Sequence, residues 1–187
     1  MPKIIPGLKE SILHRAGELI DLGEYDKFSV RSIARDCGIA VGTLYNYFSS
    51  KDELLKAVID THWQAMLDEV DKKCGEATTI TDGVCYICEG IRSFAEKHTE
   101  FWISSIMGGF TQSTGTEWKR SLRPAVMERF SALSTRLGYD LDATLLPAIA
   151  EILIALGSQC ELDINVAIKL LRQATGKLES MKSKMIP

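Results

Sequence analysis

Apolar residues recur every three to four positions along most of the chain, which is the spacing of one face of an α-helix. Leu8, Ile12, Ala16 and Leu19 form the first such stripe. Almost no segment alternates apolar and polar residues as a half-buried strand would. The pattern therefore predicts an all-helical protein, with helices at about residues 8–22, 29–37, 41–48, 50–74, 82–98, 100–110, 117–137, 143–156 and 164–182.

Glycines and capping residues mark where the first of these helices begin and end. Gly23 and Gly38 each follow an apolar stripe, as helix-terminating residues do. Ser29 is the predicted N-cap of the second helix. Ser50, with Glu53 three residues later, forms a predicted capping box for the fourth helix. The third helix is only about two turns long, whereas the fourth is long enough to link two parts of the molecule.

The most informative stretch is residues 28–55, FSVRSIARDCGIAVGTLYNYFSSKDELL. Two short helices joined by a turn near Gly38 have the order of a helix-turn-helix, whose second helix enters the DNA major groove. In that second helix Leu44 and Phe48 lie four residues apart and are predicted to face inward. The predicted outward side chains carry hydroxyl and amide groups that can reach base edges and phosphates: Thr43, Tyr45, Asn46 and Tyr47.

Residues that flank this helix favour contact with the DNA backbone. Gly42 has no side chain and would let the main chain approach DNA closely. Lys51 lies in the first turn of the next helix, where free backbone amides favour a phosphate. Arg31 can reach a phosphate or a guanine edge. The alternative is that the two tyrosines pack the small helical domain and that Asn46 and the two cations are only solvated.

The overall charge is not that of a protein that coats nucleic acid. The 187 residues include 22 Lys and Arg against 25 Asp and Glu, a net charge of −3. DNA binding would therefore need a local basic patch. Such a patch is predicted between residues 27 and 51, where one acid, Asp36, faces four cations: Lys27, Arg31, Arg35 and Lys51.

The five cysteines show no disulfide-framework spacing and indicate a reducing compartment. Cys85 and Cys88 are interpreted as core residues of a helix, with a dithiol enzyme as the alternative. The sequence has no Gly-rich phosphate loop and no metal-spaced His and acidic set, so we expect no enzyme activity, metal or cofactor. No signal peptide is visible, and the most apolar stretch, residues 145–156, is too short to cross a bilayer. A cytoplasmic protein without membrane contact is expected.

The order of residues across the helix-turn-helix is itself characteristic. The set comprises Ser29, Val30, Arg31, Ile33, Ala34, Gly38, Gly42, Thr43, Leu44, Tyr45, Tyr47, Phe48, Lys51, Glu53 and Leu54. It resembles the DNA-binding segment of TetR-family repressors, closely over residues 8–57. The resemblance implies about nine helices, with a DNA-binding domain at 1–57 and a helical effector-binding and dimerisation domain at 58–187. The chain departs from the family at Ala40 and Val41, where a Ser cap and a polar or basic residue are common.

The resemblance also implies a transcriptional repressor that binds a palindromic DNA operator as a homodimer and is released by a small-molecule effector. A TetR-like activator, or a DNA-binding regulator without effector response, is the alternative. Five of the expected DNA-binding residues match positions that commonly contact DNA in the family: Arg31, Thr43, Tyr45, Tyr47 and Lys51. The full expected set adds Ser29, Val41, Gly42 and Asn46.

The effector and the partner subunit are expected to use the later helices. Large side chains there would suit an apolar or aromatic effector, or form an ordinary core: Phe94, Trp102, Ile106, Met107, Phe110, Trp118 and Met127. The last two predicted helices carry more apolar surface than one covering layer needs, unless it is buried within the subunit. A four-helix bundle with a second subunit would use Ile149, Ile152, Leu153, Leu156, Leu170 and Leu171.

Overall fold

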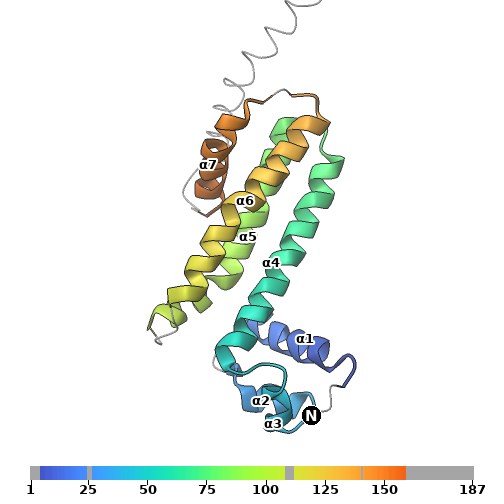
Figure 1. The fold of residues 1–187 in the computed structure, drawn as a ribbon, viewed down its shortest axis with the longest axis vertical. Helices are drawn as coiled ribbons and strands as arrows, with labels where there is room; N and C mark the ends of the chain where they lie inside the picture. The colour runs from blue at the N-terminus through green and yellow to red at the C-terminus, as the bar shows by residue number, and fades with distance from the viewer. Residues whose placement is uncertain (1–4, 25–26, 108–111, 140, 159–187) are drawn as a thin grey trace, which may run out of the picture. The chain divides into compact units, whose positions relative to one another are not determined.

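The computed structural model describes residues 5–24, 27–107, 112–139 and 141–158, with the side chains of residues 100–120 outside that description. Within these ranges the chain forms helices and no strand, which confirms the all-helical prediction (Figure 1). The predicted helix at 164–182 lies outside the described residues. The helices are α1 (Leu8–Asp21), α2 (Val30–Asp36), α3 (Val41–Tyr45), α4 (Lys51–Glu76), α5 (Ile80–Met107), α6 (Gln112–Arg136) and α7 (Leu146–Ser158), the last preceded by a 3-10 turn at Ala143–Leu145.

The chain divides into two compact units. The first unit is residues 1–66 with 94–116, and the second is residues 67–93 with 117–187. The long helices α4, α5 and α6 each run from one unit into the other. The predicted domain boundary at residue 57 differs from these unit boundaries, and the two predicted domains stay a prediction. None of the described helices combines the length and apolarity that a membrane-spanning segment needs.

Helix α5 is longer than the sequence suggested. Separate helices were predicted at 82–98 and 100–110, but residues 80–107 form one continuous helix. Thr99, at the predicted break, donates its hydroxyl to the carbonyl of Ala95 at 2.7 Å. That bond gives the Thr99 hydroxyl a partner within the helix, so the threonine does not interrupt the backbone hydrogen bonds of α5. Gly75, predicted to lie in a loop, is in the last turn of α4.

Helices α1, α2 and α3, called here the N-terminal bundle, share a small apolar interior in the first unit. Helix α1 packs on α2, and α2 packs on α3. Each helix contributes a side chain with no exposed surface: Ile12, Ile33 and Leu44. Full burial of one such side chain stabilises a fold by about 1.5–3 kcal/mol. These three positions therefore supply much of the free energy that holds the short helices together.

The second unit brings its helices together at glycines. A Cβ atom on Gly83 of α5 would lie 2.2 Å from Leu133 Cδ2 of α6. A Cβ atom on Gly157 of α7 would lie 2.7 Å from Ile91 Cβ and 3.0 Å from the carbonyl oxygen of Cys88, both on α5. The predicted helix ended at residue 156, before Gly157, yet Gly157 is the penultimate residue of α7. At Gly157 an added side chain would meet a Cβ atom and a backbone oxygen that cannot rotate away, whereas at Gly83 the Leu133 side chain would have to shift.

Arginines of α6 tie down the end of α4 in the second unit. Arg136 Nη2 donates to the carbonyl of Cys74 at 2.7 Å and also to the carbonyl of Ala77. The last carbonyls of a helix have no partner within it, so a guanidinium satisfies them well. Arg129 pairs with Asp71 one turn earlier, at 2.8 Å. The short connection between α4 and α5 is thereby held by its backbone.

Candidate nucleic-acid interface

Helix α2 begins at a capping box that confirms Ser29 as the N-cap. Ser29 Oγ accepts a hydrogen bond from the backbone N–H of Ser32 at 3.1 Å. Ser32 Oγ accepts one from the N–H of Ser29 at 3.3 Å, and it lies 2.6 Å from the carbonyl of Lys27, to which it donates. These bonds satisfy N–H groups that have no partner inside the helix. The first turn of α2, which carries the exposed Arg31, is therefore fixed by the chain's own serines.

The turn between α2 and α3 is a Schellman motif. Gly38 has a left-handed backbone with φ +66°. The N–H of Gly38 donates to the carbonyl of Arg35 at 3.0 Å, and the N–H of Ile39 donates to the carbonyl of Ala34 at 2.9 Å. This pattern ends α2 before Gly38, whose left-handed backbone would be strained if the residue had a side chain. The turn that separates the two helices of the helix-turn-helix is thus encoded at Gly38.

Helix α3 has the two faces that the sequence predicts. Leu44 has no exposed surface and Phe48 is 2% exposed, whereas Tyr45 is 48% exposed and Asn46 is also exposed. The helix itself spans only five residues, and Phe48 lies in the turn that follows. Ala40, at the N-cap, makes no side-chain capping bond. The orientation of α3 therefore depends on its burial and on contacts made after the helix.

Tyr47 differs from the predicted outward set. Its side chain is half-buried, and its hydroxyl lies 2.6 Å from the backbone nitrogen of Ile5 and 3.3 Å from the carbonyl oxygen of the same residue. No local sequence pattern signals this contact, because the two residues are 42 positions apart. Thr43 and Val41 are half-buried, and Gly42 is exposed, with no heavy atom within 4 Å of where its Cβ would be. The main chain at Gly42 is thus open to a close approach.

The start of α4 carries Lys51, another of the predicted DNA-binding residues. Lys51, the first residue of α4, is exposed, and its ammonium lies 5.6 Å from the centre of the Phe28 ring. Ser50 Oγ accepts a bond from the N–H of Glu53 at 3.0 Å, as the predicted capping box requires. The Glu53 carboxylate accepts instead from the N–H and hydroxyl of Ser49, both at 2.6 Å. These bonds lower the pKa of Glu53, which stays charged at the positive end of α4.

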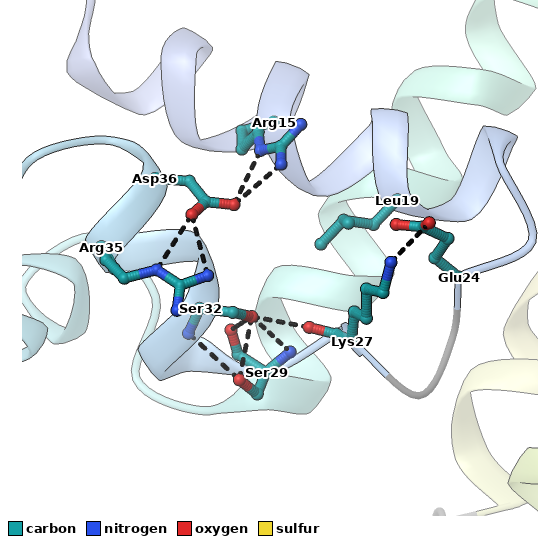
Figure 2. A pocket seen from close by; sticks show the side chains of 8 residues that line it. All are labelled: Arg15, Leu19, Glu24, Lys27, Ser29, Ser32, Arg35 and Asp36. Atoms are coloured by element: carbon teal, nitrogen blue, oxygen red, sulfur yellow. Dashed lines mark hydrogen bonds and ion pairs between the residues drawn. The ribbon is translucent and has the colours of Figure 1, made fainter.

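The predicted basic patch is smaller than the sequence suggested. A polar pocket between α1 and α2 shows why (Figure 2). Asp36 accepts two hydrogen bonds from Arg15, at 2.8 and 3.0 Å, and one from Arg35 at 3.2 Å. The Arg15 guanidinium, more than Arg35, holds the pKa of Asp36 below its usual value. Lys27 pairs with Glu24 at 2.7 Å. Two of the four predicted cations are thus paired with carboxylates.

Only two of the seven residues predicted to line the effector pocket, Phe94 and Met127, have described side chains. Phe94 is buried in the first unit, with its ring 5.2 Å from Trp63 and 4.5 Å from His98. His98 is fully buried, and neither of its ring nitrogens has a hydrogen-bond partner among the described residues. Met127 is half-buried in the second unit. The side chains of Trp102, Ile106, Met107, Phe110 and Trp118 lie outside the described residues, so this pocket stays a prediction.

The predicted dimer residues of α7 separate into two groups. Leu153 has no exposed surface and Leu156 is 6% exposed, so both are used within the second unit. Ile152 is 45% exposed and Ile149 is half-buried. Leu145, just before α7, is 52% exposed and belongs to the same predicted apolar surface. Leu170 and Leu171 lie outside the described residues.

The Cys85 and Cys88 pair has the environment of core residues. Cys88 is fully buried, its thiol lies 3.7 Å from the carbonyl of Leu153, and burial raises its pKa to about 12. Burial also raises the pKa of the half-buried Cys85. A nucleophilic or redox-active cysteine needs an accessible thiolate, which a raised pKa opposes. The dithiol alternative is therefore disfavoured.

Comparison with known proteins agrees with this geometry. Residues 12–58 match the model of a family described as "Bacterial regulatory proteins, tetR family". The chain is 40% identical over 70 residues to the uncharacterized HTH-type transcriptional regulator YvdT of Bacillus subtilis (strain 168), a match that covers 37% of this chain and 36% of that protein. The curated relatives are thus matched over little more than a third of their length.

Solved structures with the same fold cover most of the chain. A putative TetR-family transcriptional regulator from Rhodococcus sp. has a TM-score of 0.58 and 14% identity, over 92% of this chain and 98% of that one. The fatty acid degradation regulator FadR from Bacillus halodurans has a TM-score of 0.53 and 20% identity, over 91% and 95%. Residues 12–58 therefore form a segment of the TetR type, and the described helices have a fold similar to that of a solved TetR-family regulator.

Proposed function

We propose that this chain is a transcriptional repressor that binds a palindromic DNA operator as a homodimer and is released by a small-molecule effector. The observation that carries the proposal is the two-sided α3, with Leu44 fully buried and Tyr45 and Asn46 exposed on a short helix. Side chains of these types can read base edges in the major groove. Arg31 and Lys51, both exposed, would supply phosphate contacts that set the register.

The main chain and the caps complete the proposed DNA-binding surface. The exposed Gly42 would let the backbone of α3 approach the DNA, and the Ser29 cap fixes the helix turn that carries Arg31. Val41 and Thr43, both half-buried, would contribute the rest of the contacts near the start of α3. In this arrangement phosphate contacts position the protein, while Tyr45 and Asn46 select the sequence.

The proposed dimer rests on an apolar stripe at the start of α7. Leu145, Ile149 and Ile152 follow helical spacing, and the first and last are 52% and 45% exposed. Exposed large aliphatic side chains at one face suit a self-complementary interface across a two-fold axis. Such an axis would place two copies of α3 about 34 Å apart, one turn of DNA. The effector would be apolar or aromatic, in keeping with Phe94 and the other predicted pocket residues.

Selection from random duplexes tests the proposal directly. The full-length protein would be used to enrich bound DNA over several rounds, and the product would be sequenced and assayed by gel shift. We expect a two-fold symmetric site whose half-sites lie about one helical turn apart. Enrichment of no symmetric site, or equal affinity for selected and random duplexes, would contradict the proposed function. Promoter-fusion expression with and without the protein then separates a repressor from an activator.

A further inference from the structure

The hydroxyl of Tyr47 joins the end of the recognition helix to the start of the chain. It accepts a hydrogen bond from the backbone N–H of Ile5 at 2.6 Å and lies 3.3 Å from the carbonyl of Ile5, to which it can donate. The backbone N–H and the carbonyl of Ile5 thus both lie within hydrogen-bond distance of the Tyr47 hydroxyl oxygen. This is a side-chain contact with main chain, so it fixes the path of the backbone at residue 5.

The segment that Tyr47 holds is itself an ordered turn. The N–H of Leu8 donates to the carbonyl of Ile5 at 3.2 Å, and Gly7 has a left-handed backbone with φ +74° that leads into α1. Ser11 Oγ donates to the carbonyl of Gly7 at 2.9 Å. These hydrogen bonds join the turn at residues 5–7 to the start of α1. The bond from Tyr47 to Ile5 therefore links the end of α3 to α1 through this turn.

Helix α3 needs such a contact because it cannot hold its own orientation. It has five residues, and helices of that length are unstable in isolation. Ala40 gives no side-chain cap at its N-terminal end. Leu44 and Phe48 anchor one side by burial. Tyr47 lies just after the C-terminal end of α3, between Leu44 and Phe48 in the sequence. Its hydroxyl adds a directional hydrogen bond to Ile5.

We propose that Tyr47 is a positioning residue for DNA binding: its hydroxyl fastens the turn before α1 to the end of α3 and so sets the orientation in which α3 presents Tyr45 and Asn46. The inference rests on the proposed DNA-binding function. It assigns Tyr47 a different role from Tyr45, which is 48% exposed and is expected to touch the bases. Without this bond α3 samples more orientations, and fewer molecules are ready to bind.

A double-mutant cycle on the full-length protein and the selected duplex tests the assignment. Tyr47→Phe removes the hydroxyl and keeps the ring, while Ile5→Pro removes the N–H that donates to it. Each should weaken specific binding about three- to tenfold, the change expected for one hydrogen bond. The double variant should be no weaker than either single variant, because both remove the same bond. Ile5→Ala, which keeps the N–H, is the matched control and should bind as the unchanged chain does.

Tyr45→Phe supplies the contrasting cycle. Combined with Ile5→Pro, its fold-loss should multiply with that of the proline variant, because the two act at independent points. If Tyr47→Phe instead costs the same factor with and without Ile5→Pro, Tyr47 contacts DNA itself and the proposal is wrong. Unchanged affinity in both single variants would also overturn it.

A spectroscopic readout in the absence of DNA separates this proposal from the proposed function. The amide resonance of Ile5 should shift in Tyr47→Phe, and its hydrogen exchange should become about three- to tenfold faster as the bond is lost. If the Ile5 amide has the same resonance and exchange rate in the two proteins, the positioning role of the Tyr47 hydroxyl is contradicted even if operator binding is confirmed. A protein that selects no duplex would contradict the proposed function, whatever the state of the Ile5 amide.

Discussion

The N-terminal bundle and the second unit are stabilised in different ways. In the N-terminal bundle, short helices are ended and oriented by local hydrogen bonds, such as the Ser29 cap and the Schellman turn at Gly38. In the second unit, long helices approach closely where Gly83 and Gly157 leave no side chain between them. The first arrangement depends on particular polar groups, and the second depends on the absence of a side chain.

This difference explains why one region has a recognisable sequence and the other has not. A cap or a turn needs a particular residue at a particular position, so the pattern can be read along the chain. Close packing at a glycine depends on which residue of a distant helix lies opposite, and many apolar sequences satisfy it. Substitutions can therefore show whether the two regions respond as differently as their contacts indicate.

The largest effect is expected from Leu44→Ala in α3. Leu44 has no exposed surface, and truncation of such a residue costs about 2–5 kcal/mol of unfolding free energy. Urea denaturation measures the loss. Tyr45→Ala on the exposed side of the same helix should change stability by less than about 0.5 kcal/mol and yet weaken specific DNA binding by about 1–3 kcal/mol. Comparable stability losses in the two variants would mean that α3 does not have one buried and one exposed face.

Acid should destabilise the first unit through a buried histidine. Burial, with a smaller effect from the nearby His62, lowers the pKa of His98 to about 4. The unfolded chain has the higher histidine pKa, so it binds more protons between about pH 6.5 and 4. The unfolding free energy should fall by up to about 3 kcal/mol as the pH drops through that range. Urea titrations at several pH values measure this slope.

The control for the acid effect is His98→Phe, which removes both ring nitrogens, neither of which has a hydrogen-bond partner among the described residues. Its stability should fall less steeply between the same pH limits. His62, whose pKa burial also lowers, still contributes in this variant. Identical pH profiles for the two proteins would show that His98 does not remain neutral and buried in the folded chain.

A smaller loss is expected from Gly157→Ala in the second unit. The added methyl would meet the Cβ of Ile91 and the backbone of Cys88, neither of which can rotate away. Overpacking of this kind costs about 1–3 kcal/mol. Gly75→Ala in α4, where the methyl enters open space, should be neutral or stabilise by up to about 1 kcal/mol. Equal responses at both glycines would mean that close packing does not depend on the missing side chain at Gly157.

The smallest effects are expected at the caps of the N-terminal bundle. Ser29→Ala should cost about 1 kcal/mol because it removes the side-chain acceptor for the backbone N–H of Ser32 in α2. Ala40→Ser should give α3 a cap that it lacks and stabilise by about 0.5–1 kcal/mol, since Ala40 already has the extended backbone of an N-cap. Thermal unfolding detects both changes. A stabilising Ser29→Ala would contradict the capping box.

The sequence predicts the N-terminal bundle better than the contacts between its parts. The Ser29 and Ser50 caps, the turn at Gly38 and the inward Leu44 are all confirmed, because each follows from residues within one turn of the chain. The bond from Tyr47 to Ile5 joins residues 42 positions apart, and no local pattern signals it.

Charges and glycines were harder to interpret for the same reason. The sequence places several cations near α2 but does not show that Arg15 of α1 and Arg35 both bind Asp36. Gly157 looked like a helix break, because a glycine that serves close packing has the same sequence signature as one that ends a helix. In both cases the deciding neighbour is distant in the sequence.

The hydrogen bonds that Arg136 donates have a consequence for evolution and protein engineering. The arginine binds the carbonyl oxygens of Cys74 and Ala77, groups that every amino acid possesses. The anchor should therefore survive substitution of the exposed Thr78, whereas Ala77 is buried and Thr79 caps the start of α5. An inserted residue would move those oxygens out of reach of the guanidinium, so variation in this corner should occur in composition rather than in length.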